Sequence, residues 1–239
     1  MLEVARRLNE RCFELLASVA DSNVARDQFS CVFSSRERWA RVDARASERA
    51  GRCPVLLLDL NFRQAEWWTN VRRWDIRDAP RTTSSALFAA DSAICLSREI
   101  LIEARGFVRS TPHGVGLVFG MAQGVAAAIS DMSIADIDRI AMQHSSLLRP
   151  RWEGNRIFWS RLLEATLVSD DDMLTEVHLH SLQLLGAERF SRSDEALAHC
   201  TVRYESSTVT ISTIPIVHKQ PLKVIDLTQI EIPEDPPSS

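Results

Sequence analysis

The chain has 239 residues, which suffices for one domain of ordinary size or two small ones with a real hydrophobic core. It is 45% hydrophobic and 25% charged, and no apolar run approaches the roughly 18 residues that a membrane span requires. Its first residues mix Arg6, Arg7 and Glu10 with apolar side chains, unlike a secretory signal peptide. We therefore expect a cytoplasmic protein that is neither secreted nor inserted in a membrane.

Charge is distributed unevenly along the chain. Residues 1–82 carry 15 Arg against 12 acidic side chains, whereas residues 83–239 carry 13 basic and 20 acidic ones. The net charge of −4 and the pI near 5.9 argue against a protein that coats nucleic acid by itself, because such surfaces are strongly basic. Any DNA contact should be local or shared with a basic partner. The scattered cysteines predict reduced thiols rather than a disulfide framework or a zinc finger.

Helical periodicity dominates the first half of the chain. Glu3–Val19 places its apolar residues on one stripe and predicts an amphipathic helix. The Arg-rich stretch Arg36–Arg49 lies between Ser35 and Gly51, which are typical cap residues, and predicts a second helix. The continuous apolar stretch 53–62 fits either a buried strand or the start of a buried helix.

Further helices are expected beyond the Pro-, Thr- and Ser-rich stretch 79–85. They are Ile94–Val108, a segment from Thr111 that Gly120 interrupts and Ala126–Ile129 continues, Ser133–His144, Asn155–Val168, and a helix from Asp170 that Gly186 should end. After Ser191, alternating polar and β-branched residues in Thr201–Val217 predict short strands or an extended arm, followed by a disordered acidic tail. The expected organisation is a helical domain at 1–80, a linker at 81–93, a helical domain at 94–190, and the arm and tail at 191–239.

Several stretches of the middle segment share a pattern with a known family. They are ILIEARGFVRS (100–110), the turn VFGM at Gly120, MSIADIDRIA (132–141) and LLRPRWE (147–153). On these residues, the segment from about Ile94 to Leu163 resembles the flagellar transcriptional regulator FlhD, the partner of FlhC in bacteria. The resemblance implies an all-helical, dimer-forming subunit that assembles with an FlhC-like protein and activates transcription. The cysteine that links FlhD subunits falls at Leu148 here, so that covalent bridge is absent.

Residues 1–80 resemble a degenerate copy of the same unit. Leu8–Ser22 can be placed over Leu96–Ser110 with apolar residues in similar positions, and the later apolar run and Trp-bearing segment follow in the same order. A period of about 90 residues is long for a solenoid but natural for two fused protomers. One chain would then fold as an internal pseudo-dimer. The alternative is two helical domains without any repeat.

Catalytic chemistry has little support in the sequence. His178 and His180, with Glu176, form the only cluster that resembles a metal site. Helical positions two apart point about 200° away from each other, so both imidazoles cannot face one ion. Phosphate-binding and nucleophile motifs are absent as well. We expect no enzyme activity, no metal and no cofactor.

Candidate binding residues fall into three groups. Arg149, Arg151 and Arg156 surround Trp152 and are the candidates for DNA contact, with solvated helix ends as the alternative. Large apolar side chains are the candidates for a subunit interface, since buried aromatics dominate such surfaces; they are Ile100, Phe107, Ile140, Trp67, Trp68 and Trp159.

The third group lies in the tail, where the motif VIDLT contains Val224, Ile225 and Leu227 and is followed by acidic residues. It resembles a short strand that docks on the edge of a sheet. In a bacterial regulator it would be an edge strand or a docking peptide for the partner subunit. In a protein delivered to a eukaryotic cell it would be a SUMO-interacting motif.

The sequence thus predicts a mostly α-helical protein with compact helical domains resembling FlhD, an internal pseudo-dimer, and an extended or short-β C-terminal arm. The expected function is that of a subunit of an FlhD/FlhC-type transcriptional activator. It would assemble with an FlhC-like partner, reach promoter DNA through the complex, form homo-oligomers and avoid membranes. The alternative is a non-DNA-binding adaptor, or a secretion or effector protein, that binds partners through its helical surface and C-terminal arm.

Overall fold

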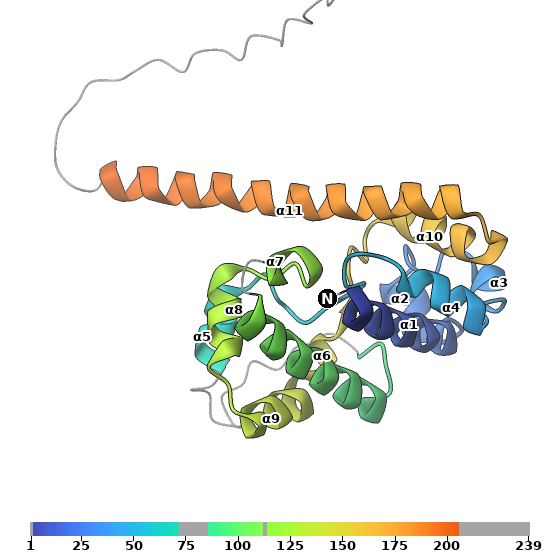
Figure 1. The fold of residues 1–239 in the computed structure, drawn as a ribbon, viewed down its shortest axis with the longest axis horizontal. Helices are drawn as coiled ribbons and strands as arrows, with labels where there is room; N and C mark the ends of the chain where they lie inside the picture. The colour runs from blue at the N-terminus through green and yellow to red at the C-terminus, as the bar shows by residue number, and fades with distance from the viewer. Residues whose placement is uncertain (1, 72–85, 112–113, 206–239) are drawn as a thin grey trace, which may run out of the picture. The chain divides into compact units, whose positions relative to one another are not determined.

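The structure, a computed structural model, describes residues 2–71, 86–111 and 114–205. Its described part is mainly helical, which confirms the predicted class (Figure 1). The helices are α1 (Leu2–Val19), α2 (Asn23–Gln28), α3 (Arg36–Trp39), α4 (Ala44–Gly51), α5 (Ala65–Val71), α6 (Ala90–Ser110), α7 (Val115–Val118), α8 (Gln123–Ser130), α9 (Ile134–His144), the 3₁₀ turn η1 (Ser145–Leu147), α10 (Arg156–Val168) and α11 (Asp171–Glu205). Two short strands, β1 (Leu58–Asp59) and β2 (Arg149–Pro150), form an antiparallel pair.

Contacts group Met1–Asp194 into one compact unit and Glu195–Ser239 into another. Of the second unit the described part comprises the last residues of α11. Residues on both sides of the expected linker 81–93 therefore share a single core. Within that stretch, α6 already begins at Ala90.

Helix boundaries agree best with the sequence where a cap is unambiguous. At the start of α9, the Ser133 hydroxyl accepts a hydrogen bond from the Asp136 N–H (3.1 Å), and the Asp136 carboxylate accepts one from the Ser133 N–H (3.0 Å). This reciprocal pair is a capping box, and the helix ends at His144 as expected. Asn155 caps α10 by accepting from the Phe158 N–H (3.0 Å).

The helix predicted over Arg36–Arg49 is divided into α3 and α4. Asp43 accepts a hydrogen bond from the Ala46 N–H (2.9 Å) and starts α4, whereas Ser35 makes no side-chain cap bond. An aspartate inside a helical pattern competes for the N-cap role, and here it introduces a break.

The helix that Gly186 was expected to end continues as α11 to Glu205, so the prediction of an extended arm is wrong for residues 191–205. A glycine inside a helix costs only about 1 kcal/mol relative to alanine. The helix-forming segment around Glu195 and Leu197 outweighs that cost. The remainder of the expected arm and tail, 206–239, lies outside the described residues.

The same order of elements occurs twice along the described chain. Helix α1 starts at Leu2 and α6 at Ala90, 88 residues later, while β1 starts at Leu58 and β2 at Arg149, 91 residues later. Between them, α2, α3 and α4 in the first half correspond to α7, α8 and α9 in the second. After the strands, α5 corresponds to α10.

The packing of these two halves is reciprocal. Helix α1 packs on α4 and α6 packs on α9, while α5 of the first half contacts α8 of the second and α10 of the second contacts α3 of the first. Strands β1 and β2 pair antiparallel, with Leu58 opposite Pro150 and Asp59 opposite Arg149. Antiparallel pairing of two equivalent strands is what a twofold relation between the halves produces. Each half thus packs its last helix, α5 or α10, against the other half, and this explains why the two halves form one core.

Backbone detail after each strand follows the same repeat. Asn61 and Trp152, 91 residues apart, both have left-handed backbone conformations, with φ of 60° and 52°. The Trp68 indole N–H donates to the carbonyl of Asn61 (3.0 Å), and the Trp159 indole donates to the carbonyl of Arg151 (3.0 Å). Each buried tryptophan thus fixes the tight turn that leads from its strand into the next helix.

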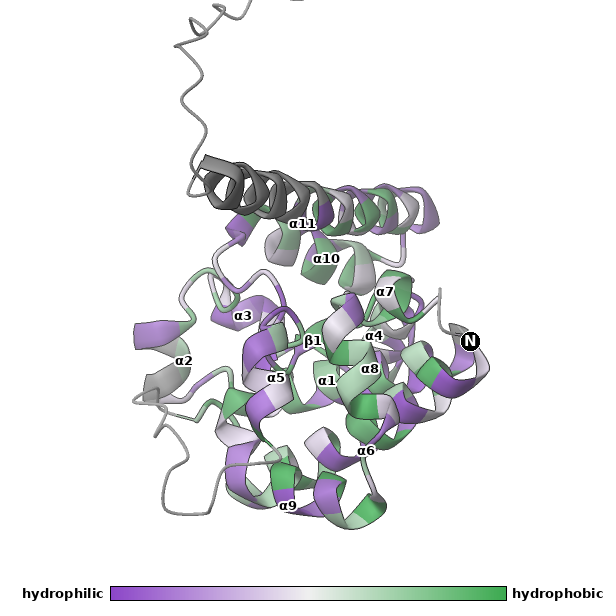
Figure 2. Cartoon of the chain, turned by 90° about the vertical axis from the view of Figure 1, so that its left-hand side faces the viewer, coloured by the Kyte–Doolittle hydropathy of each residue, from purple (hydrophilic) through white to green (hydrophobic). Residues whose placement is uncertain are grey.

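The core is continuous across both halves. Its largest fully buried side chains are Trp39, Trp68, Trp159, Phe13, Phe29, Phe62, Phe119, Phe158, Leu8, Leu16, Leu56 and Leu57. Helix α8 is hydrophobic over its middle and α3 is mostly hydrophilic (Figure 2). The stretch 53–62, which the periodicity left undecided, is a buried segment that contains β1 rather than a helix.

Candidate functional site

The three arginines expected to contact DNA lie in different environments. Arg156 is exposed at the start of α10, whereas Arg149 is half-buried and forms an ion pair with Glu153 (3.1 Å). Arg151 is only 3% exposed. Its guanidinium donates to the carboxylate of Glu188 (3.2 Å), so it faces the protein interior.

Burial of Arg151 depends on a distant glycine. Gly120 has a left-handed backbone (φ 61°), and a Cβ there would overlap the Arg151 guanidinium. The two residues are far apart in sequence, so no local pattern could reveal this contact. Only Arg156, of the three, is placed to meet a phosphate.

Three further exposed arginines belong to the same region of the fold. Arg161 follows Arg156 on α10, while Arg41 and Arg45 flank the start of α4, and none of these four forms an ion pair with another described residue. Helix α10 contacts both α3 and α4, so these arginines come from elements that adjoin one another (Figure 1). We call Arg41, Arg45, Arg156 and Arg161 the arginine surface. Uncompensated guanidinium groups are what a phosphate backbone attracts.

The arginine surface borders an open hollow of about 340 Å³. Arg156 lines it together with Ser30, Cys31, Phe33 and Ser34. The lining combines hydroxyl, thiol and guanidinium groups, which are the donors that a phosphate oxygen uses. The Phe33 ring is buried and packs on Trp39 (5.4 Å between centroids).

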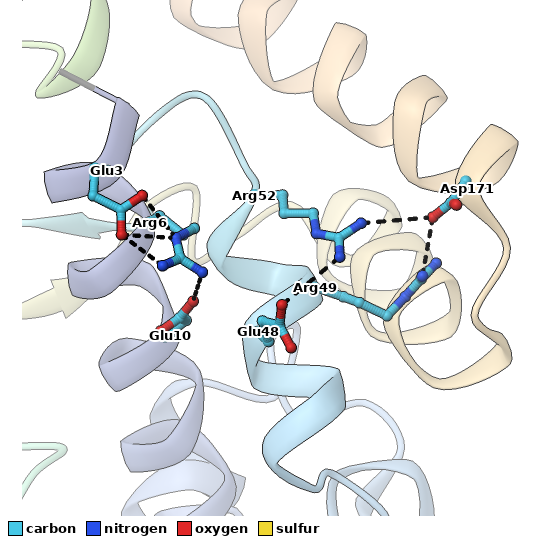
Figure 3. Close-up of polar contacts among 7 residues, drawn as sticks. All are labelled: Glu3, Arg6, Glu10, Glu48, Arg49, Arg52 and Asp171. Carbon is cyan, nitrogen blue, oxygen red and sulfur yellow. Dashed lines mark hydrogen bonds and ion pairs between the residues drawn. The ribbon is translucent and has the colours of Figure 1, made fainter.

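Neighbouring arginines of α4 are instead engaged by carboxylates (Figure 3). Asp171, at the start of α11, pairs with Arg49 (3.0 Å) and Arg52 (4.0 Å), and Arg52 also approaches Glu48 (3.8 Å). Asp171 favours the start of its helix through the helix dipole as well. These contacts anchor α11 and remove two arginines from the set available to a ligand.

The residues expected to form a subunit interface pack within the chain itself. Ile100, Phe107, Ile140, Trp68 and Trp159 are all less than 9% exposed. They belong to the shared core of the two halves.

Trp67 is half-buried and bridges the halves. Its ring meets Trp68 edge-on (4.9 Å between centroids) and also His144 of α9 (5.1 Å). Burial, followed by the charge of Arg139, lowers the pKa of His144. The neutral imidazole is therefore favoured in this aromatic contact.

His178 and His180 lie on α11, as the sequence predicts, and their rings have different surroundings. The His180 ring meets Phe158 edge-on (5.9 Å), while His178 Nε2 is buried and makes no hydrogen bond with any residue that the structure describes. Burial and then the charge of Arg52 lower the pKa of His178. Among the described residues, no three His, Cys, Asp or Glu side chains are arranged to hold a metal ion.

An apolar face of α11 was not anticipated from the sequence. Leu174, Val177 and Leu185 are buried, whereas Leu179 and Leu182 are 57% and 43% exposed. The helix thus carries apolar residues on two faces, one of which points away from the core. The expected docking motif at Val224, Ile225 and Leu227 lies outside the described residues.

Within the described residues, no helix combines the length and the apolar character needed to cross a membrane. No family model matches the chain, and neither does any curated protein or solved structure.

Proposed function

We propose that the chain is an FlhD-like subunit of a heteromeric transcriptional regulator, in which one polypeptide replaces a pair of subunits. The observation that carries the proposal is the reciprocal packing of the two halves around β1 and β2. Leu148, where the resemblance places the cysteine that links FlhD subunits, directly precedes β2 and is buried beside this junction. A residue next to a twofold axis is where an intersubunit bridge would be expected.

In this proposal the arginine surface supplies a local share of the DNA contact. The net charge of −4 disfavours binding by the chain alone, so an FlhC-like partner would supply most of the basic surface and any zinc. The regulator would then reach its promoter as a complex in the cytoplasm. No step in this role requires catalysis by the chain.

Light scattering and co-purification test the assembly. In this proposal the pairing of the two halves within one chain replaces the homo-oligomer that the sequence favours. The purified chain should therefore be a monomer of 26.9 kDa, and it should form a complex with an FlhC-like protein encoded nearby. A homodimer that dissociates on dilution, with no complex formed, would contradict the proposal.

A salt titration of promoter binding tests the role of the arginine surface. Replacing Arg156 and Arg161 by alanine should reduce the slope of log K against log salt by up to about 2, since each phosphate contact contributes about 0.9. Arg98→Ala is the matched control, because Arg98 is exposed but paired with Asp138 (2.5 Å). Equal slopes for the double variant and the control would refute the DNA contact.

The exposed Leu179 and Leu182 favour a second candidate, a non-DNA-binding adaptor that docks a partner on α11. DNA binding by the purified complex distinguishes the adaptor from the transcriptional regulator. An adaptor complex would form normally and show no DNA affinity even at low salt.

A further inference from the structure

Glu188 on α11 inserts its carboxylate among three donors that come from both halves of the fold. One oxygen, Oε1, accepts from Arg63 Nη1 (2.8 Å) and from the Trp152 indole N–H (2.9 Å). The other, Oε2, accepts from Arg151 Nη2 (3.2 Å). Arg63 follows β1 and Trp152 follows β2, so the donors converge at the junction of the repeats.

The donor set is built for an anion. Arg151 has a side chain only 2% exposed, and its Nε and Nη1 are buried and make no hydrogen bond with any described residue. The Trp152 ring lies 5.3 Å from the same guanidinium and screens it from water. The buried guanidinium of Arg151 and the half-exposed one of Arg63 face one carboxylate, so the cluster carries net positive charge, and the part on Arg151 is shielded from water. A neutral side chain in place of Glu188 would leave this charge uncompensated.

Helix α11 carries two local weaknesses that bracket the contact. Ser169, in the short link from α10, has a left-handed backbone (φ 59°), which is strained for a residue with a Cβ. Gly186 lies two residues before Glu188, and a Cβ there would have no atom within 4 Å, so packing does not require a glycine. It nevertheless weakens the helix locally. The left-handed link at Ser169 is the point about which α11 would pivot, while Gly186 makes the helix easier to deform beside Glu188.

We propose that Arg63, Arg151 and Trp152 form a carboxylate-binding site that Glu188 fills in cis, and that an acidic helix of a partner protein takes the site when α11 lifts. Charge complementarity selects this occupant, because the donors can satisfy a carboxylate and gain nothing from a neutral or basic side chain. The chain's own α11 shows that a helix bearing one glutamate fits. The site does not depend on whether the complex binds DNA.

Capture of a peptide by the full-length chain tests the site. The probe is a fluorescently labelled peptide with the sequence 171–194. It is added to the Glu188→Gln chain, in which a neutral amide replaces the carboxylate that fills the site. Two peptides are compared on this variant: the native one and one that carries glutamine in place of its glutamate at position 188. We expect the native peptide to bind at least tenfold more tightly. The Glu176→Gln chain, altered at an exposed position of the same helix, should capture neither peptide, like the native chain.

Removal of a donor provides the second arm. Adding Arg63→Gln to the Glu188→Gln chain should abolish the preference between the peptides. Equal binding of the two peptides by Glu188→Gln, or no binding, would overturn the proposal.

Should Glu188→Gln fail to fold, hydrogen exchange of Arg63→Gln decides, because Arg63 is 51% exposed and dispensable for the core. Amides around Glu188 should then exchange at least threefold faster than in an Arg98→Gln control. Unchanged exchange would also overturn the proposal.

Discussion

Replacing Gly51 by alanine probes the packing of α1 against α4. A Cβ at this buried position would lie 2.9 Å from the carbonyl oxygen of Arg6 and 2.5 Å from Cγ of Glu10. Glu10 can adjust, since its side chain is flexible. The Arg6 carbonyl belongs to the backbone of α1, so relief requires the two helices to separate.

The expected magnitude follows from two opposing effects. Alanine favours a helix over glycine by about 1 kcal/mol in the interior and by less at the last residue of α4. Overpacking against a fixed backbone costs about 1–3 kcal/mol. We expect Gly51→Ala to lower the free energy of unfolding by about 1–2 kcal/mol, and each kcal/mol should lower Tm by about 2–4 °C.

Gly106→Ala is the matched control. Gly106 lies within α6, is exposed, and a Cβ there would have no atom within 4 Å. The substitution should stabilise the protein by about 0.5–1 kcal/mol, opposite in sign to Gly51→Ala. Urea denaturation followed by tryptophan fluorescence and circular dichroism measures both. Stabilisation by Gly51→Ala would refute the close contact of α1 with α4.

Three other substitutions or conditions give measurable outcomes. Trp159→Phe leaves the buried carbonyl of Arg151 without its donor and should cost about 1–3 kcal/mol in urea denaturation; an unchanged midpoint would contradict that contact. Burial lowers the pKa of His178 from 6.5 in the folded protein. Below that pH the unfolded chain therefore binds more protons than the folded one. Stability should therefore be full above about pH 6.5 and fall as the pH drops below it, less so in His178→Asn. Cys95 is exposed whereas burial raises the pKa of Cys12, so iodoacetamide should label Cys95 before Cys12, as read by peptide mass spectrometry.

Helix positions could be predicted where local chemistry decides them. Ser133 and Asp136 form a capping box within four residues, and Asn155 caps α10 through its own backbone neighbourhood. Each half begins with a long helix, α1 or α6, and the elements then follow in the same order. Such features depend on contacts close in the sequence.

The environment of the candidate site could not be predicted in the same way. Arg149, Arg151 and Arg156 lie close together on one basic stretch, yet Arg156 is exposed, Arg149 is half-buried and Arg151 is enclosed. Arg151 is enclosed because Gly120 and Glu188 lie against its guanidinium, and only tertiary packing brings these distant residues together. The continuation of α11 past Gly186 was missed because one glycine lowers helix stability less than the following residues raise it.

The covalent joining of the two halves has a consequence for how they can change. Subunits that associate reversibly separate on dilution, whereas linked ones remain at a high effective concentration. In a homodimer, one substitution in the gene also changes both subunits at once. Here Asn61 and Trp152 hold equivalent turns with different side chains, and only the second donates to Glu188. The molecule can therefore specialise one side while the other keeps the scaffold intact.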